Sequence, residues 1–255
     1  MTIKKPPSPL PPAKLGNVKT NLHSEIARSI GERMLAGDFP PGSILPNEAE
    51  WCQVYDASRT AVREAIKLLT AKGFIVSRAK IGSRVEPRAR WNLLDREVLE
   101  WHRAASDHRA FLLKTQEARK LIEPGVAALA AEKRTQHDID RLVAAAEGMR
   151  AAKPGRALVV ADVEFHEALL AAAGNDLLAP FGAIIASALF QLFDFTTARN
   201  PKLVNALKMH EDIVKAVIAG DAAESRRRMN RLLENTDQIV LKPAAAALVK
   251  PRRAD

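Results

Sequence analysis

Apolar residues recur at helical spacing along most of the chain, and in its first part they predict three short helices. The first covers residues 24–36, the second begins at 46–48, and the third begins at Ser58 and stops at Gly73. The stretch FIVSRAKIGSRVEP that follows predicts two short strands around a basic turn. Three helices followed by a basic hairpin are the organisation of a winged helix-turn-helix.

The third helix has two different faces. Its apolar stripe consists of Ala61, Ala65, Leu68 and Leu69. Arg59 and Arg63 are four residues apart and project from the other side, and Ser58 suits the N-cap. Guanidinium groups at the open end of a helix suit phosphates or guanine edges. This stretch alone leaves open the alternative of a solvated basic face on a core helix.

The rest of the chain predicts amphipathic helices joined by short loops, which implies antiparallel neighbours in a bundle. A connecting helix is expected at 91–101. The expected bundle helices cover 109–133 (with a kink or break at Pro124), 137–151, 157–173, 176–199, 201–219 and 221–241. The predicted fold class is therefore mostly α, with an N-terminal winged helix-turn-helix and a C-terminal antiparallel all-α helical bundle.

Five parts are expected along the chain. They are a disordered proline-rich tail at 1–17, the winged helix-turn-helix at 18–88, a linker helix at 89–108, the helical domain at 109–243 and a basic tail at 244–255. The first tail contains the stretch PPSPLPP.

Composition narrows the functional class. The 255 residues are 47% hydrophobic, so a core can form, and the net charge of +9 suits nucleic acid first and an anionic membrane surface second. The lone cysteine, Cys52, excludes an internal disulfide and favours a reducing compartment. The N-terminus does not resemble a signal peptide, and no stretch approaches the roughly 20 apolar residues of a membrane span. A soluble cytoplasmic protein is expected.

Asp162 and His166 are four residues apart, so they share one face of a helix and can bind one divalent metal ion. His210 belongs to another helix, and bundle interiors commonly take ligands from facing helices. The alternatives are a hydrogen-bonded surface pair for Asp162 with His166, and a core or helix-terminal histidine for His210.

Longer motifs resemble a known family. PPGSILPNEAEWCQVYDASRTAVREAIKLLTAKGFI, residues 40–75, resembles the DNA-binding domain of GntR-type bacterial regulators. EARKLIEPGVAALAAE, DVEFHEALL and MHEDIVKAVIAGDAAESRRRM resemble the FadR-type (FCD) effector domain. The resemblance covers about residues 20–240 and implies a homodimeric transcription regulator that binds double-stranded operator DNA through the first domain. The helical domain would then bind the effector and form the dimer.

By resemblance, 58–69 is the recognition helix and the hairpin is a wing that reaches the minor groove. The residues implied in DNA binding are Ser58, Arg59, Thr60, Arg63, Lys80 and Gly82. A dimer would read the two halves of a palindrome. Many family members have arginine where this chain has Ala49, so one DNA contact is expected to be missing.

Metal-binding family members carry an aspartate and three histidines. Asp162, His166 and His210 match the first three, but the fourth position is Leu232, which cannot ligate. Asn235, water or effector would fill the gap around zinc, nickel or manganese. Alternatively, the site has lost its metal, and Asp162, His166 and His210 bind the effector directly.

Arg119 is the expected partner of an effector carboxylate, since a matching family arginine faces the effector cavity. The alternative is an ion pair with Glu123 on the helix surface. Thr196, Thr197 and Arg199 would line the mouth of the pocket or simply end a helix.

WNLLDREVLEW, after the wing, resembles the linker of sugar-acid regulators, particularly those that respond to D-galactonate. The predicted function is a ligand-responsive repressor released from its operator by a small carboxylate such as D-galactonate or gluconate, without catalytic residues or a membrane partner. Two alternatives are a metal-dependent enzyme acting on a small carboxylate and a structural nucleic-acid protein without an effector.

Overall fold

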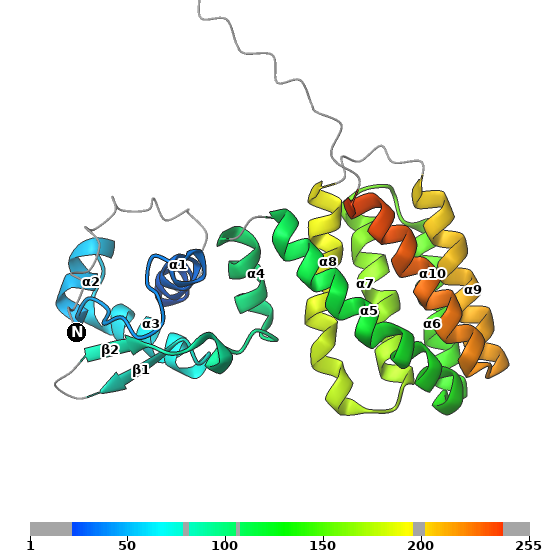
Figure 1. Ribbon diagram of the computed structural model, residues 1–255, viewed down its shortest axis with the longest axis horizontal. Helices are drawn as coiled ribbons and strands as arrows, with labels where there is room; N and C mark the ends of the chain where they lie inside the picture. The colour runs from blue at the N-terminus through cyan, green and yellow to red at the C-terminus, as the bar shows by residue number, and fades with distance from the viewer. Residues whose placement is uncertain (1–21, 79–81, 106–107, 196–201, 242–255) are drawn as a thin grey trace, which may run out of the picture. The chain divides into compact units, whose positions relative to one another are not determined.

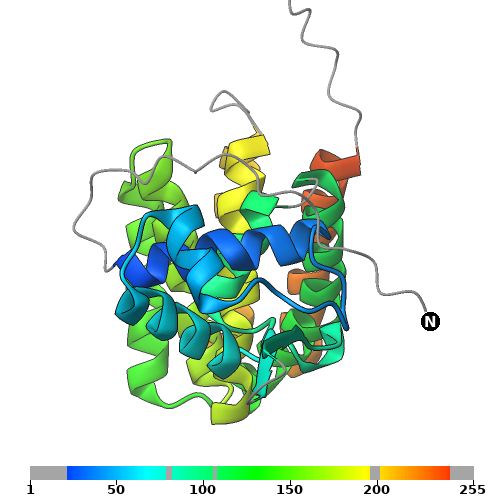
Figure 2. The same cartoon turned by 90° about the vertical axis from the view of Figure 1, so that its left-hand side faces the viewer.

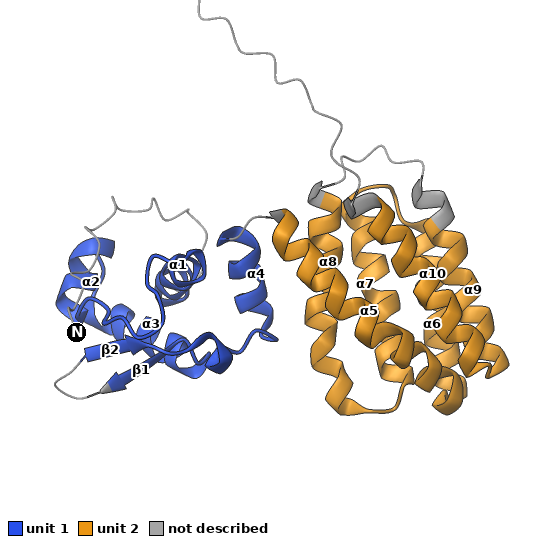
Figure 3. Cartoon of the chain, viewed as in Figure 1, with its two compact units in different colours: residues 1–107 blue, residues 108–255 orange. Residues whose placement is uncertain are grey.

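The computed structural model describes residues 22–78, 82–105, 108–195 and 202–241. The chain divides into two compact units, residues 1–107 and residues 108–255 (Figure 3). Both units are mainly helical, as the apolar pattern predicts. The two predicted tails, Lys80, Thr196, Thr197 and Arg199 lie outside the described residues.

Unit 1 is a winged helix-turn-helix (Figure 1). Its elements are, in order, α1 (Leu22–Ala36), α2 (Glu48–Tyr55), α3 (Arg59–Ala71), β1 (Ile75–Arg78) and β2 (Gly82–Val85). The two strands pair in antiparallel register, with Ile75 opposite Val85 and Arg78 opposite Gly82. Ile26, Trp51, Leu69 and Phe74 are buried in the core of this unit.

The apolar stripe of α3 differs slightly from the predicted one. Ala65 and Leu69 are fully buried, and so is Val62, which the predicted stripe omitted. Ala61 and Leu68 are only partly buried at the margin of the core. The buried face is therefore turned toward Val62, and the arginines remain outside it.

The connecting helix starts later than the predicted 91–101. After a 3-10 turn, η1 (Arg88–Arg90), Trp91 stacks on Phe74 with the ring centroids 4.5 Å apart. The Asp95 side chain accepts hydrogen bonds from the backbone N–H groups of residues 97 and 98, so α4 (Arg96–Ala105) begins only there. This helix packs against α1 within unit 1.

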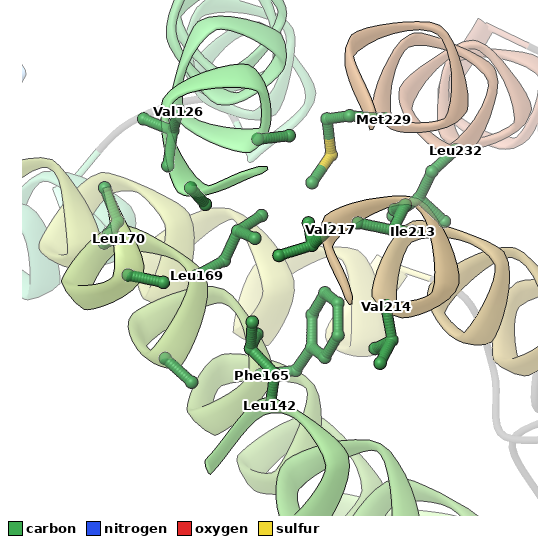
Figure 4. Close-up of a cluster of buried hydrophobic side chains, with 14 of the residues drawn as sticks. Val126, Leu142, Phe165, Leu169, Leu170, Ile213, Val214, Val217, Met229 and Leu232 are labelled. Atoms are coloured by element: carbon green, nitrogen blue, oxygen red, sulfur yellow. The ribbon is translucent and has the colours of Figure 1, made fainter. Parts of the chain in front are cut away.

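Unit 2 is a helical bundle whose helices run roughly along one direction (Figures 1 and 2). Its elements are α5 (His108–Lys133), α6 (Gln136–Ala151), α7 (Arg156–Ala172), the 3-10 turn η2 (Asp176–Phe181), α8 (Gly182–Phe195), α9 (Lys202–Ala219) and α10 (Ala222–Leu241). Apolar side chains, among them Phe165, Ile213 and Met229, meet in its core (Figure 4).

The helices of this unit differ in detail from the predicted ones. Of the kink or break predicted at Pro124, the break is absent, because α5 is helical throughout its length, and the kink stays a prediction. The predicted helix at 176–199 instead begins with η2, which contains Pro180, and becomes α-helical at Gly182. Contrary to expectation, the described residues include one stretch, Asp176–Phe193, that is long and apolar enough to cross a membrane by length and composition. Its α-helical part packs against α5 and α7 in the bundle.

Candidate DNA-binding surface and metal centre

Local capping interactions define the ends of α2 and α3 in the helix-turn-helix. The Asn47 side chain accepts hydrogen bonds from the N–H groups of Ala49 and Glu50, and the Glu50 carboxylate accepts one from the Asn47 N–H. This capping box starts α2. The helix ends at Asp56, whose φ of 46° lies in the left-handed region. Ser58 then caps α3, as predicted, by accepting a hydrogen bond from the Ala61 N–H at 3.3 Å.

The start of α3 presents its polar residues to solvent. Ser58, Arg59, Thr60 and Arg63 are all exposed. Arg63 is also paired with Glu48 of α2, with 2.8 Å between Nε and Oε2, and both side chains are about half exposed. Exposed ion pairs of this kind are worth only about 0.2–1 kcal/mol, so a phosphate or a base can displace Glu48. Gly82 is exposed at the first position of β2.

In unit 2, two helices bring the three predicted ligands together. Asp162 and His166 lie on α7 and His210 lies on α9. The Oδ1 atom of Asp162 is 3.3 Å from Nε2 of His166 and 3.2 Å from Nε2 of His210. One ligand atom from each of the three residues lies within 4.8 Å of the others. Both histidines are buried, so the alternative of a surface hydrogen-bonded pair is wrong.

The outer nitrogen of each histidine faces a hydrogen-bond acceptor. Nδ1 of His210 is 2.7 Å from the Ala206 carbonyl oxygen, and Nδ1 of His166 is 2.8 Å from Oε2 of Glu123. With Nδ1 donating, Nε2 of His210 has a lone pair that faces a carboxylate oxygen. Within the described residues, Nε2 of His210 and Oδ1 of Asp162 make no hydrogen bond of normal geometry, although they are only 3.2 Å apart. Histidine ligands of metals commonly have this outer hydrogen bond.

These donors suit a divalent cation. Two imidazole nitrogens and one carboxylate oxygen are ligands for zinc, nickel or manganese. A cation would also satisfy the unpartnered acceptor atoms of Asp162 and His210. Leu232 is buried among apolar core residues and provides no ligand atom, and Asn235 is partly buried. The three residues Asp162, His166 and His210 therefore fit a metal with coordination positions left for other ligands.

Arg119 and Glu123 of α5 extend this polar centre. Nε of Arg119 is 2.5 Å from Oε1 of Glu123, and each side chain is only 2% exposed. The pair anticipated as an alternative is therefore present, but it is buried instead of lying on the surface. Nη2 of Arg119 is also 3.4 Å from Nε2 of His166, so the guanidinium borders the three ligands. The role of Arg119 toward an effector stays a prediction.

Charge determines the protonation of this centre. Burial alone would raise the pKa of Glu123, but Arg119 and His166 outweigh it and lower the pKa to about 2. Burial alone would lower the pKa of His166, but Glu123 and Asp162 raise it to about 9. For Asp162 too, burial is outweighed, and His210 and His166 hold its pKa well below the usual range. A metal ion would take over the positive charge that the proton supplies.

Sequence reasoning missed two features. Glu123 was considered only as a surface partner of Arg119, yet it contacts both Arg119 and His166. Gln191, within the apolar stretch AIIASALFQLF, is 2% exposed, and no other described residue is a hydrogen-bond partner for either of its amide atoms. Polar residues, Ser187 and Gln191, within an otherwise apolar helical run are the available signal.

Both units of the chain match known protein families. Residues 22–85 match the model of the gntR family of bacterial regulatory proteins, and residues 115–235 match the FCD domain. The Escherichia coli K12 galactonate operon transcriptional repressor is 33% identical, over 80% of this chain and 91% of its own length. The uncharacterised E. coli regulator YieP is 32% identical, over 86% and 95%.

A solved structure from Streptococcus agalactiae, described as GntR, has the same fold. Its TM-score is 0.50 at 20% sequence identity, and the match covers 85% of this chain and 99% of that one. The E. coli K12 Exu regulon transcriptional regulator is 29% identical, over 84% of this chain and 83% of its own length.

Proposed function

The chain belongs to the GntR family of bacterial regulators and has an FCD domain, and from this premise we propose that it is a repressor released from operator DNA by a sugar acid. GntR regulators of this kind are DNA-binding transcription factors and not enzymes. The proposed effector is an aldonate such as D-galactonate or D-gluconate, and the proposed assembly is a cytoplasmic homodimer.

For DNA binding, the proposal rests on the exposed start of α3. Arg59 and Arg63 would bind phosphates or guanine edges, and Ser58 and Thr60 would contact the backbone. Lys80 and Gly82 of the wing would lie in the minor groove. The net charge of +9 favours association with DNA. In a dimer, two α3 helices would read two half-sites of a palindrome.

The effector half rests on one observation: Asp162, His166 and His210 point three ligand atoms at one another inside the bundle. A divalent ion bound there would supply positive charge and free coordination positions for a carboxylate. Arg119 would stabilise the same carboxylate from the side of α5. This arrangement suits a small polar acid better than a fatty acid, which needs a long apolar tunnel.

The sugar-acid assignment draws on the relatives as well as on the site. One relative is named for the galactonate operon and another for the Exu regulon. An aldonate has one carboxylate for the metal or Arg119 and several hydroxyls for the surrounding polar groups. Its binding would shift the dimer toward states in which the two α3 helices no longer match one operator.

Fluorescence anisotropy with DNA from upstream of the gene tests the proposal. The full-length protein, loaded with zinc, nickel or manganese, should bind this DNA selectively and release it when D-galactonate or D-gluconate is added. Selective binding that no sugar acid weakens would reject the proposed effector. Absence of any salt-sensitive, sequence-selective complex would reject the proposed repressor.

A further inference from the structure

The interior of unit 2 has buried polar groups outside the Asp162, His166 and His210 cluster that find no hydrogen-bond partner among the residues that the structure describes. Both amide atoms of Gln191 on α8 are unpartnered, and its side chain is almost completely buried. The hydroxyl of Ser187, four residues earlier and so on the same side of α8, is buried and unpartnered too. A buried polar group without a partner destabilises the folded state, so these groups need an explanation.

Helix register places both residues at the level of the metal centre. α7 and α8 are joined through η2 and pack against each other, and a Cβ at Gly182 would lie 3.4 Å from Leu170. Gln191 follows Gly182 by nine residues, which is about 13 Å along the axis of α8 at 1.5 Å per residue. Asp162 precedes Leu170 by eight residues, which is about 12 Å along the axis of α7 in the same direction. Gln191 and Asp162 therefore lie at nearly the same level.

The same register places Ser187 near the level of His166. α8 also packs against α5, the helix that carries Arg119 and Glu123. The polar groups of α8 are therefore beside the two helices that supply the carboxylate-binding and metal-binding side chains. The side chains of Ser187 and Gln191 differ from those of the metal centre, because a hydroxyl and a primary amide carry no charge.

An amide and a hydroxyl each offer both a donor and an acceptor, which is what a sugar hydroxyl needs. We propose that Ser187 and Gln191 form a hydroxyl-binding wall of the effector site and select a polyhydroxylated acid over an aliphatic acid of equal length. This inference rests on the effector site proposed above. Sites built to bond a hydroxyl discriminate strongly against analogues without it, because their own polar groups are then left unpaired.

Calorimetric titration of the metal-loaded full-length protein tests this wall, with D-galactonate, D-gluconate and hexanoate as probes. Gln191→Leu should weaken aldonate binding at least tenfold and leave hexanoate binding unchanged or tighter. The same variant should melt at an equal or higher temperature without ligand, because it removes a buried unpaired amide. Ser187→Ala, a smaller change, should weaken aldonate binding several-fold in a natively folded protein.

Ser225→Ala is the matched control, since Ser225 is fully buried with an unpartnered hydroxyl but lies in the first turn of α10. It should bind aldonates like the wild type. If the Gln191→Leu and Ser187→Ala proteins also bind aldonates like the wild type, the proposal that these residues bind effector hydroxyls is rejected, whereas the proposed function is not. Reduced melting temperatures with unchanged preference for aldonate over hexanoate would assign both residues a structural role instead. A wild-type protein that binds no aldonate would overturn both proposals.

Discussion

At the scale of single residues, Glu123 joins the two halves of the buried centre. One carboxylate contacts the Arg119 guanidinium and the His166 imidazole, and all three side chains are only 2% exposed. Glu123 therefore orients His166 toward Asp162 and neutralises Arg119. An effector carboxylate that binds Arg119 has to share it with Glu123.

Glu123→Gln should lower the free energy of unfolding at pH 7 by about 3–5 kcal/mol, because it leaves the buried Arg119 guanidinium without its counter-charge and removes one of the two carboxylates beside His166. Urea denaturation followed by circular dichroism measures this. The folded-state pKa of about 2 lies below the ordinary 4.5, so the stabilisation is complete above pH 4.5 and disappears as the pH falls toward 2. The difference between the two proteins should shrink over that range.

Glu132→Gln serves as the control for this change, since Glu132 is exposed near the end of the same helix. It should alter stability by less than about 0.5 kcal/mol. An equal loss in both variants would mean that the buried network of Arg119, Glu123 and His166 contributes nothing particular.

Arg59→Ala should weaken operator binding by roughly 5- to 150-fold, which corresponds to the about 1–3 kcal/mol of a bidentate guanine contact. Arg150→Ala removes the same charge from an exposed position in unit 2 and should change the affinity by less than about twofold, since it alters only net charge. Anisotropy titrations at one fixed salt concentration compare the two. Similar losses would show that Arg59 acts only through net charge.

At the scale of elements, α1 and α4 approach closely because Gly31 has no side chain. A Cβ at this position would lie 2.5 Å from Cε3 of Trp101, inside van der Waals contact. Trp101 is buried in the core of unit 1 and cannot move aside freely. The contact fixes α4 to the helix-turn-helix.

Gly31→Ala should therefore destabilise the protein by about 1–3 kcal/mol through overpacking. Gly148→Ala is the matched opposite case, because Gly148 lies within α6 and an added Cβ would meet nothing within 4 Å. It should stabilise the protein by about 0.5–1 kcal/mol. Scanning calorimetry should show a lower melting temperature for Gly31→Ala and a higher one for Gly148→Ala. A Gly31→Ala protein as stable as the wild type would refute the close approach of α1 and α4.

At the scale of the whole molecule, regulation requires that the centre in unit 2 influence DNA binding by unit 1. A ligand changes an equilibrium only by the difference in its affinity for the two states. If the metal strengthens effector binding at a shared centre, the effector must strengthen metal binding by the same factor.

Metal removal by a chelator should thus weaken aldonate binding and abolish release of DNA. Returning the metal should raise the melting temperature, since a ligand at 100 times its dissociation constant stabilises by about 2.7 kcal/mol. His210→Leu should lose this rise, whereas His137→Leu, at an exposed position on α6, should keep it. Equal aldonate affinity with and without metal would argue for direct binding by the polar side chains.

Much of this molecule follows from its sequence alone. The spacing of apolar residues gave the helices, because burial of one face dominates helix formation in proteins. The Ser58 cap and the exposure of Arg59 and Arg63 also followed from local rules. The i, i+4 spacing places Asp162 and His166 on one face of α7, and the expectation of ligands from facing bundle helices adds His210, which the motif resemblance supports.

Tertiary structure alone decided which polar residues are buried and what they contact. Sequence spacing could pair Arg119 with Glu123, but only the packing of α5 against α7 puts that pair out of solvent and against His166. Trp91 likewise stacks on Phe74, a contact that local rules do not predict. Local rules describe single helices, whereas burial and contact depend on neighbours that are distant in the chain.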